Sequence, residues 1–146
     1  IRITETDALP APFSTKLRTR EHNIIYIGIA SESLRSRLLD QELRSRGHGT
    51  FFRSIGAVLG FLPPKGSLKG KGNKRNYKFS PEDSQKIITW INKYLLVKWD
   101  TETSDLEGTE SLLIRKYSPL FNLKGNPNKL TELEVLRKKC VEIANR

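Results

Sequence analysis

Asn23-Ile24-Ile25-Tyr26-Ile27-Gly28-Ile29-Ala30 is the stretch that decides the fold. Its β-branched residues predict a strand. Because successive side chains of a strand point to opposite faces, alternate isoleucines share one face, while Tyr26 and Gly28 share the other. Gly28 contributes no side chain, so another group can approach the backbone beside Tyr26. A tyrosine within a strand is usually a packing residue, and alone it is a weak functional signal.

Two helices are predicted directly after this strand. The first covers residues 34–46, is capped by Ser31 or Ser33 and is stopped by Gly47. Its leucines form a broad apolar face beside a polar stripe. The second begins with Thr50 as its cap and continues through residue 59.

The second half of the chain alternates helix and strand signals. Ser80-Pro81-Glu82-Asp83 predicts a helix start, with a capping side chain, a proline in the first turn and early carboxylates. Residues 95–101 are a predicted strand, and residues 106–117 a predicted helix that ends before Pro119.

A last helix is predicted over about residues 131–145. Thr131-x-x-Glu134 reads as its capping box, and Cys140 falls within its apolar stripe, as a core residue rather than a catalytic one. Taken together, the elements predict a single domain over residues 1–146 of α+β class. We expect an α/β-type sandwich, in which helices flank a small, mainly antiparallel central sheet.

The charge balance favours a nucleic-acid partner. The chain has 26 lysines plus arginines against 16 aspartates plus glutamates, a net charge of +10 with a pI near 9.9. Such an excess suits a polyanion, because neutralising phosphates releases condensed counterions. A solubilising surface, or a scattered basic surface of ribosomal type, would explain the charge as well.

Cysteine usage and hydropathy limit the other classes. A single cysteine excludes a disulfide within the chain and a cysteine-based zinc cluster, which fits an intracellular, cytoplasmic protein. No apolar run approaches the roughly 20 residues of a membrane span. The chain has no methionine, not even at position 1, so we expect a processed, truncated or excised chain with a possible further domain or partner subunit.

A basic loop is predicted over residues 63–78, which hold three glycines and no acidic residue. It can be a solvated, mobile segment, or an arm that follows phosphates and becomes ordered on binding DNA. We prefer the arm. The candidate nucleic-acid contacts are its six cations together with one from the helix over residues 34–46: Arg44, Lys65, Lys69, Lys71, Lys74, Arg75 and Lys78.

Glu110 is the most informative candidate for chemistry. At helical spacing it shares a face with Leu106, Leu113 and Tyr117, where a carboxylate is costly unless it is paired, hydrogen-bonded or bound to metal. Two plainer explanations stay open. Glu110 can be stabilised by the helix dipole in a first turn, or paired with an arginine of the helix over residues 34–46.

Three separated motifs resemble the GIY-YIG nuclease family. They are Tyr26-Ile27-Gly28, then Leu34-Arg35-Ser36-Arg37-Leu38 after a short loop, and finally Glu110 before an apolar pair with Asn122 ending the following turn. The match covers roughly residues 8–123, with the basic loop as an insertion. The order of the three motifs is more specific than Tyr-Ile-Gly alone.

The resemblance implies a metal-dependent DNA endonuclease that hydrolyses phosphodiester bonds with one metal ion. Glu110 would bind Mg²⁺ or Mn²⁺, since a hard cation prefers a carboxylate oxygen plus waters. Arg37 would clamp the scissile phosphate. Tyr26 would activate or orient the attacking water, and Asn122 would brace the site.

The chain departs from the family pattern at several positions. The first half of the signature matches Ala11-Pro12-Phe13, which keeps an aromatic ring without a hydroxyl. Ile29 stands where the family often has a basic residue, and Gln41 replaces a His or Tyr one turn after Arg37. His48 could serve instead only if its loop folds back. Phe13 and His48 are therefore auxiliary candidates.

These departures keep two other hypotheses open. One is a catalytically weak or inactive nucleic-acid-binding module that retains the nuclease fold. The other is an RNA-associated basic protein in which Glu110 is merely ion-paired. An enzyme needs Mg²⁺ and Glu110, whereas a binding module depends on the basic loop.

Overall fold

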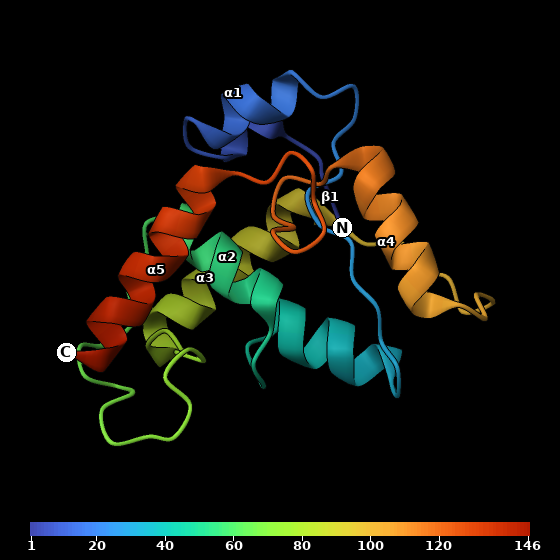
Figure 1. Ribbon diagram of the computed structural model, residues 1–146. Coiled ribbons are helices and arrows are strands. Elements are labelled where there is room, and N and C mark those ends of the chain that lie inside the picture. Colours follow the sequence, from blue (N-terminus) through green and yellow to red (C-terminus); the bar gives the residue numbers. More distant parts are fainter.

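The computed structural model describes all residues, 1–146, as a helical protein with one small sheet (Figure 1). The sheet has two antiparallel strands, in which Arg2 pairs with Leu96 and Ile3 with Leu95. The elements in chain order are β1 (Arg2–Ile3), η1 (Thr6–Ala8), α1 (Phe13–Arg18), η2 (Arg35–Leu43), α2 (Thr50–Val58), α3 (Pro81–Tyr94), β2 (Leu95–Leu96), α4 (Leu106–Tyr117) and α5 (Thr131–Asn145). The mixed class and small antiparallel sheet are confirmed, while the sandwich arrangement stays a prediction.

The predicted strand over residues 23–30 forms only in part. Ile24 makes a single antiparallel bridge with Arg2. The amide of Ile3 donates to the carbonyl of Asn23 at 3.0 Å, and the amide of Ile25 donates to the carbonyl of Ile1 at 3.0 Å. The Tyr26 backbone still exchanges hydrogen bonds with Ile1, but beyond Tyr26 no strand lies beside the chain, so regular pairing stops there. The predicted strand over residues 95–101 is likewise limited to β2.

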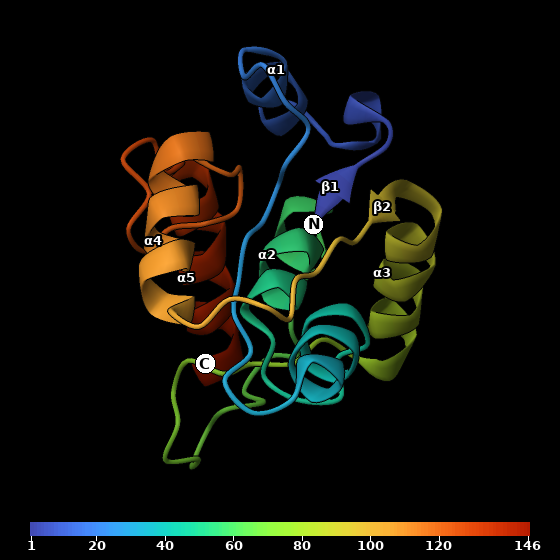
Figure 2. The same ribbon diagram turned by 90° about the vertical axis from the view of Figure 1, so that its right-hand side faces the viewer.

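Helix α2 lies at the centre of the protein. Every residue from Phe51 to Val58 is buried, and the helix contacts α5, η2 and α3 (Figures 1 and 2). Gly56 permits this packing, because a Cβ there would lie 2.3 Å from the Phe79 ring. The prediction of this helix is confirmed, but Gly49 is its N-cap and Thr50 its first residue, so the predicted Thr50 cap is wrong.

The two later helices begin as the sequence indicates. The hydroxyl of Ser80 caps α3 by accepting from the amide of Asp83 at 3.1 Å. Helix α4 spans the predicted residues and is capped by Asp105. In α5 the predicted capping box is absent: Leu130 is the N-cap, and Glu134 pairs with Lys129 instead. Cys140 is buried in the core, as expected.

Element η2 is a π-helix, although the leucine spacing predicts an α-helix. A π-helix closes hydrogen bonds from residue i to residue i+5, so each turn is wider than an α-helical turn. Side chains five positions apart therefore share a face. In an α-helix the same two side chains would point in clearly different directions.

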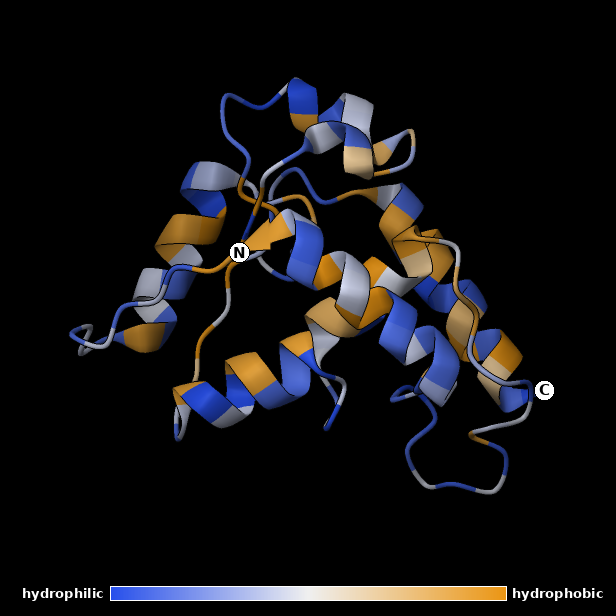
Figure 3. Ribbon diagram, turned by 180° about the vertical axis from the view of Figure 1, so that it is seen from behind, coloured by the Kyte–Doolittle hydropathy of each residue, from blue (hydrophilic) through white to orange (hydrophobic).

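The basic loop over residues 63–78 is anchored to the end of α5. The amides of Gly66 and Leu68 donate to the carbonyls of Ile143 and Ala144 at 3.1 and 2.7 Å. The Leu68 side chain is buried. Figure 3 shows this mainly hydrophilic loop beside the C-terminus. The loop is therefore attached to α5 through backbone hydrogen bonds, and its role as an arm that follows phosphates stays a prediction.

Candidate functional site

A cavity of about 500 Å³ lies where residues 26–30 meet η2, α4 and residues 97–103. Figure 2 shows the connection from β2 to α4 crossing the segment that leads into η2. The cavity is lined by Tyr26, Arg37 and Glu110, three of the four predicted catalytic residues. Positions separated by more than 80 residues in the chain therefore meet in one place.

Tyr26 lies at the inner wall of this cavity. Its ring packs 5.2 Å from the ring of Phe51 and covers Gly28, where an added Cβ would lie 2.9 Å from the tyrosine ring. Burial, and then the nearby Glu42 carboxylate, raise the pKa of the Tyr26 hydroxyl above its ordinary value. The hydroxyl is therefore protonated at neutral pH, which suits donating or accepting a hydrogen bond better than acting as a free phenolate base.

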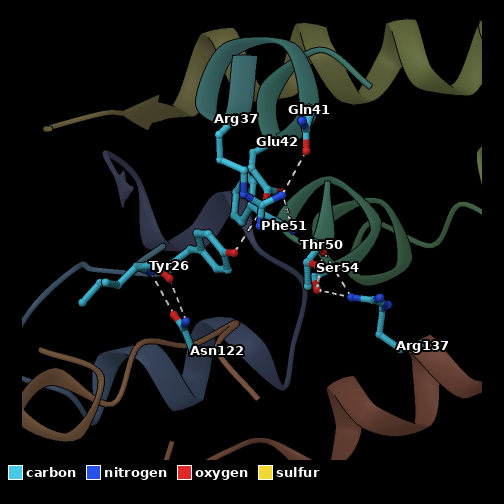
Figure 4. A network of polar contacts seen from close by, with 10 residues as sticks. Tyr26, Arg37, Gln41, Glu42, Thr50, Phe51, Ser54, Asn122 and Arg137 are labelled. Atoms are coloured by element: carbon cyan, nitrogen blue, oxygen red, sulfur yellow. Dashed lines mark hydrogen bonds and ion pairs between the residues drawn. The ribbon is translucent and has the colours of Figure 1, made fainter. Parts of the chain in front are cut away.

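Glu42 organises the wall behind Tyr26 and was not identified from the sequence. Its carboxylate, 3% exposed, pairs with the Arg37 guanidinium at 2.8 Å. It also accepts from the amide of Phe51 at 2.7 Å and lies 3.5 Å from the Tyr26 hydroxyl (Figure 4). Because the Phe51 amide belongs to the first turn of α2, the carboxylate also satisfies an N-terminal donor there.

The π-helix explains both this contact and why it was missed. Arg37 and Glu42 are five positions apart, and the wider turn places them on one face of η2. Arg37 also donates to the amide oxygen of Gln41 at 3.2 Å. Since its side chain is 35% exposed, the guanidinium reaches the cavity while its other contacts hold its position.

Glu110 faces the same cavity without a partner. Its carboxylate makes no hydrogen bond and no ion pair, and Arg37 is paired with Glu42 instead. Glu110 is the fifth residue of α4, beyond the first turn. Both plainer explanations of its position, an arginine partner and a first-turn dipole, are therefore wrong.

Burial is the main influence on the charge state of Glu110. Burial raises the pKa of its carboxyl above the ordinary value, while Arg37 and Lys124 lower it by a smaller amount. No group of three or more His, Cys, Asp or Glu side chains is positioned to hold a metal ion. A hard divalent ion could still bind here, because Mg²⁺ commonly takes one or two carboxylates and completes its shell with water and substrate phosphate.

Asn122 lies behind the cavity rather than in its wall. Its amide nitrogen donates to the carbonyl of Ile27 at 2.8 Å, and its amide oxygen accepts from the Ile27 amide at 2.9 Å (Figure 4). The side chain thereby serves as the hydrogen-bonding partner that a neighbouring strand would provide. It fixes the backbone between Tyr26 and Gly28, and its role in bracing a catalytic site stays a prediction.

The two auxiliary candidates lie elsewhere. Phe13 begins α1, is buried and packs edge-on against Phe121 at 6.1 Å between ring centroids. The segment that pairs with residues 23–25 is Ile1–Ile3, and Ala11-Pro12-Phe13 takes no part in that pairing. His48 is exposed in the loop before α2 and does not line the cavity.

The predicted nucleic-acid contacts lie outside the cavity. Arg44 donates to the side-chain oxygen of Asn92 at 2.9 Å. The six loop cations are exposed, and the loop lies beside the C-terminus, away from α4 (Figure 1). Lys74 donates to the carbonyl of Leu68 at 3.3 Å, so it also stabilises the loop.

Comparison with known families agrees with this arrangement. The family model described as the GIY-YIG catalytic domain matches residues 1–139. The chain belongs to the GIY-YIG family. Membership places it in a nuclease-type family, which supports an endonuclease acting on nucleic acid. Searches of curated proteins and of solved structures found no significant match. None of the helices has the length and apolar character needed to cross a membrane.

Proposed function

We propose that this GIY-YIG domain is a metal-dependent DNA endonuclease that hydrolyses phosphodiester bonds by a one-metal mechanism. The observation that carries the proposal is the unpaired Glu110 carboxylate in the same cavity as the Arg37 guanidinium. A carboxylate left partly buried without a partner is costly, and a bound cation would offset that cost. The positive net charge of +10 favours a polyanionic substrate.

Glu110 and Arg37 have different proposed roles, which follow from the chemistry of their side chains. Glu110 would hold Mg²⁺ or Mn²⁺, which when bound polarises a phosphoryl oxygen and lowers the pKa of a coordinated water. Arg37 offers a planar guanidinium that stabilises negative charge developing on the phosphate oxygens. It enters the reaction already positioned, because Glu42 and Gln41 hold it.

Tyr26 and Asn122 would orient other groups rather than transfer a proton. The protonated Tyr26 hydroxyl can orient the attacking water through a hydrogen bond, while its raised pKa disfavours direct proton abstraction. Asn122 holds the Ile27 backbone, and through it the ring of Tyr26. Neither side chain needs to change its charge during the reaction.

A nucleic-acid-binding module without turnover is the alternative. It is favoured by the cavity lining, which contains no histidine and no tyrosine other than Tyr26. Such a module would still bind DNA through the exposed lysines and arginines of the basic loop.

Cleavage of supercoiled plasmid separates the two functions. The nuclease predicts nicking with Mg²⁺ or Mn²⁺ that is lost in EDTA and in Glu110→Ala. Plasmid that stays intact, with equal DNA binding by both proteins, would contradict the nuclease and favour the binding module.

A further inference from the structure

The cavity is more apolar than a phosphate site requires. A phosphodiester is an anion, and Arg37 and Lys98 are the cations that line the cavity. About half of the remaining lining residues are aliphatic, and Glu42, Asp100 and Glu110 add carboxylates. The apolar residues, drawn from η2, α4 and the two connecting segments, include Leu34, Leu38, Val97, Leu106 and Leu113. A volume of about 500 Å³ with such walls suits a ligand that has a flat apolar body as well as a charge.

Trp99 supplies an aromatic surface to this cavity. It lines the cavity and is 62% exposed, whereas the other tryptophan, Trp90, packs 5.2 Å from the ring of Tyr94. An exposed indole has a large apolar area that gains free energy when it is covered. Its neighbour Lys98 adds a positive charge that attracts a phosphate-bearing ligand.

The cavity lining also includes polar side chains that could form hydrogen bonds with the edge of a flat ligand. Thr101 and Thr109 line the cavity, and neither hydroxyl makes a hydrogen bond within the chain. Asp100 differs, because its carboxylate accepts from the Glu102 amide at 3.0 Å and from the Thr103 hydroxyl at 2.9 Å. These contacts keep the acidic group engaged within its own loop.

We propose that this cavity receives one unstacked nucleobase of the bound strand, with Trp99 as its stacking surface. The inference rests on the proposed function, since Arg37 would hold the adjacent phosphate. An aromatic side chain stacks on any base, because every base has a π-face. The substrate class is then DNA with an unpaired or easily extruded base beside the bond to be cut, where the cost of unstacking is smallest.

Binding to two duplexes of one sequence tests this inference. One duplex is fully paired, and the other has a single unpaired 2-aminopurine, whose fluorescence reports stacking. In EDTA, which prevents cleavage, we expect about 10-fold or tighter binding of the unpaired duplex. We also expect quenching of the 2-aminopurine fluorescence as the base stacks on the indole. Equal affinity for the two duplexes would overturn the inference.

Three variants assign the effect to Trp99. Trp99→Ala should remove most of the preference and of the quenching, while Trp99→Phe should keep part of both, because phenylalanine still stacks. Leu112→Ala is the matched control, since Leu112 is 63% exposed on α4 and does not line the cavity. A preference that survives Trp99→Ala, or falls equally in Leu112→Ala, would also overturn the inference.

The outcomes separate this inference from the proposed function. If the protein cleaves with Mg²⁺ but Trp99→Ala cuts paired and unpaired duplexes as the wild type does, the inference fails and the nuclease stands. If no DNA is cleaved but the preference depends on Trp99, the nuclease fails and the base-binding cavity stands.

Discussion

The cavity and the basic loop differ in how their charged side chains are paired and exposed. In the cavity, Arg37 is paired with the buried Glu42, and Glu110 is unpaired but partly desolvated. The loop over residues 63–78 carries six exposed cations and no acid. The first arrangement fixes a few charges in place, whereas the second offers many charges to solvent. Under the proposed function, chemistry would belong to the cavity and electrostatic affinity for nucleic acid to the loop.

The two regions also lie apart, with the loop beside the C-terminus and the cavity bordered by α4 (Figure 1). A nucleic acid that reaches both must extend along the protein. Substitutions in the cavity should then change the rate of cleavage with little effect on salt dependence. Substitutions in the loop should change the salt dependence of DNA binding with little effect on the rate of cleavage.

Arg37→Lys should reduce the cleavage rate strongly while leaving the fold nearly undisturbed. Lysine keeps a charge for Glu42 but lacks the planar fork that binds phosphate oxygens in pairs. We expect the cleavage rate to fall by about 10²- to 10³-fold, with nearly the same melting temperature. Arg37→Ala would also leave Glu42 buried without its partner, so a lower cleavage rate could result from a less stable fold. An unaltered rate in Arg37→Lys would place the phosphate elsewhere.

Glu42→Ala should give the largest loss of stability. The substitution leaves Arg37 without its carboxylate and the Phe51 amide without an acceptor. We expect the free energy of unfolding to fall by on the order of 3 kcal/mol, measured by urea denaturation. Glu82→Gln is the matched control, because it breaks an exposed pair with Lys86 and should change nothing measurable. Equal small effects in both variants would show that the Glu42 network is not structural.

The raised pKa of Glu110 predicts how pH affects rate and stability. Metal binding needs the carboxylate, so the cleavage rate should fall on acidification at a higher pH than for an ordinary glutamate. The stability of the folded protein changes with pH in the opposite direction to the cleavage rate. A carboxyl whose folded pKa is raised favours the folded state below its unfolded pKa, and this contribution disappears as pH rises through the folded pKa. Without metal, Glu110→Gln should therefore be at least as stable as the wild type at neutral pH, checked by thermal melting.

Replacing Lys69 and Lys71 with alanine should have the smallest effect, limited to binding. Both side chains are exposed and make no hydrogen bond, so the fold should be unchanged. Each lost phosphate contact should reduce the slope of log affinity against log salt by about 0.9. The control is Lys86→Ala with Lys93→Ala on α3, which removes the same charge at another surface. Equal slopes in both double variants would remove the loop from the interface.

The sequence predicted what depends on local patterns. The resemblance to the GIY-YIG family, rather than any local pattern, led to the expectation that Tyr26, Arg37 and Glu110 act together, and they line one cavity. The bounds of α4 and the cap of α3 were also correct, because capping residues and apolar spacing are local signals.

Apart from the wrongly predicted caps of α2 and α5, the misses involve long-range pairing or unusual helix geometry. Nothing within residues 23–30 shows that Ile1–Ile3 is their partner, or that the Asn122 side chain takes the place of a strand at Ile27. Glu42 was missed because α-helical spacing turns it away from Arg37, whereas the π-helix brings the two together. The role of α5 in anchoring the basic loop likewise depends on contacts between distant segments.

The most direct test compares Glu110→Gln with Glu107→Gln in Mg²⁺-dependent cleavage of one DNA substrate. Both glutamates lie on α4, but Glu107 is exposed in the first turn and does not line the cavity. The account predicts that Glu110→Gln abolishes cleavage while DNA binding and melting temperature persist, and that Glu107→Gln cleaves at the wild-type rate. Cleavage that survives in Glu110→Gln, or falls equally in both variants, would contradict the assignment of Glu110 as the metal carboxylate.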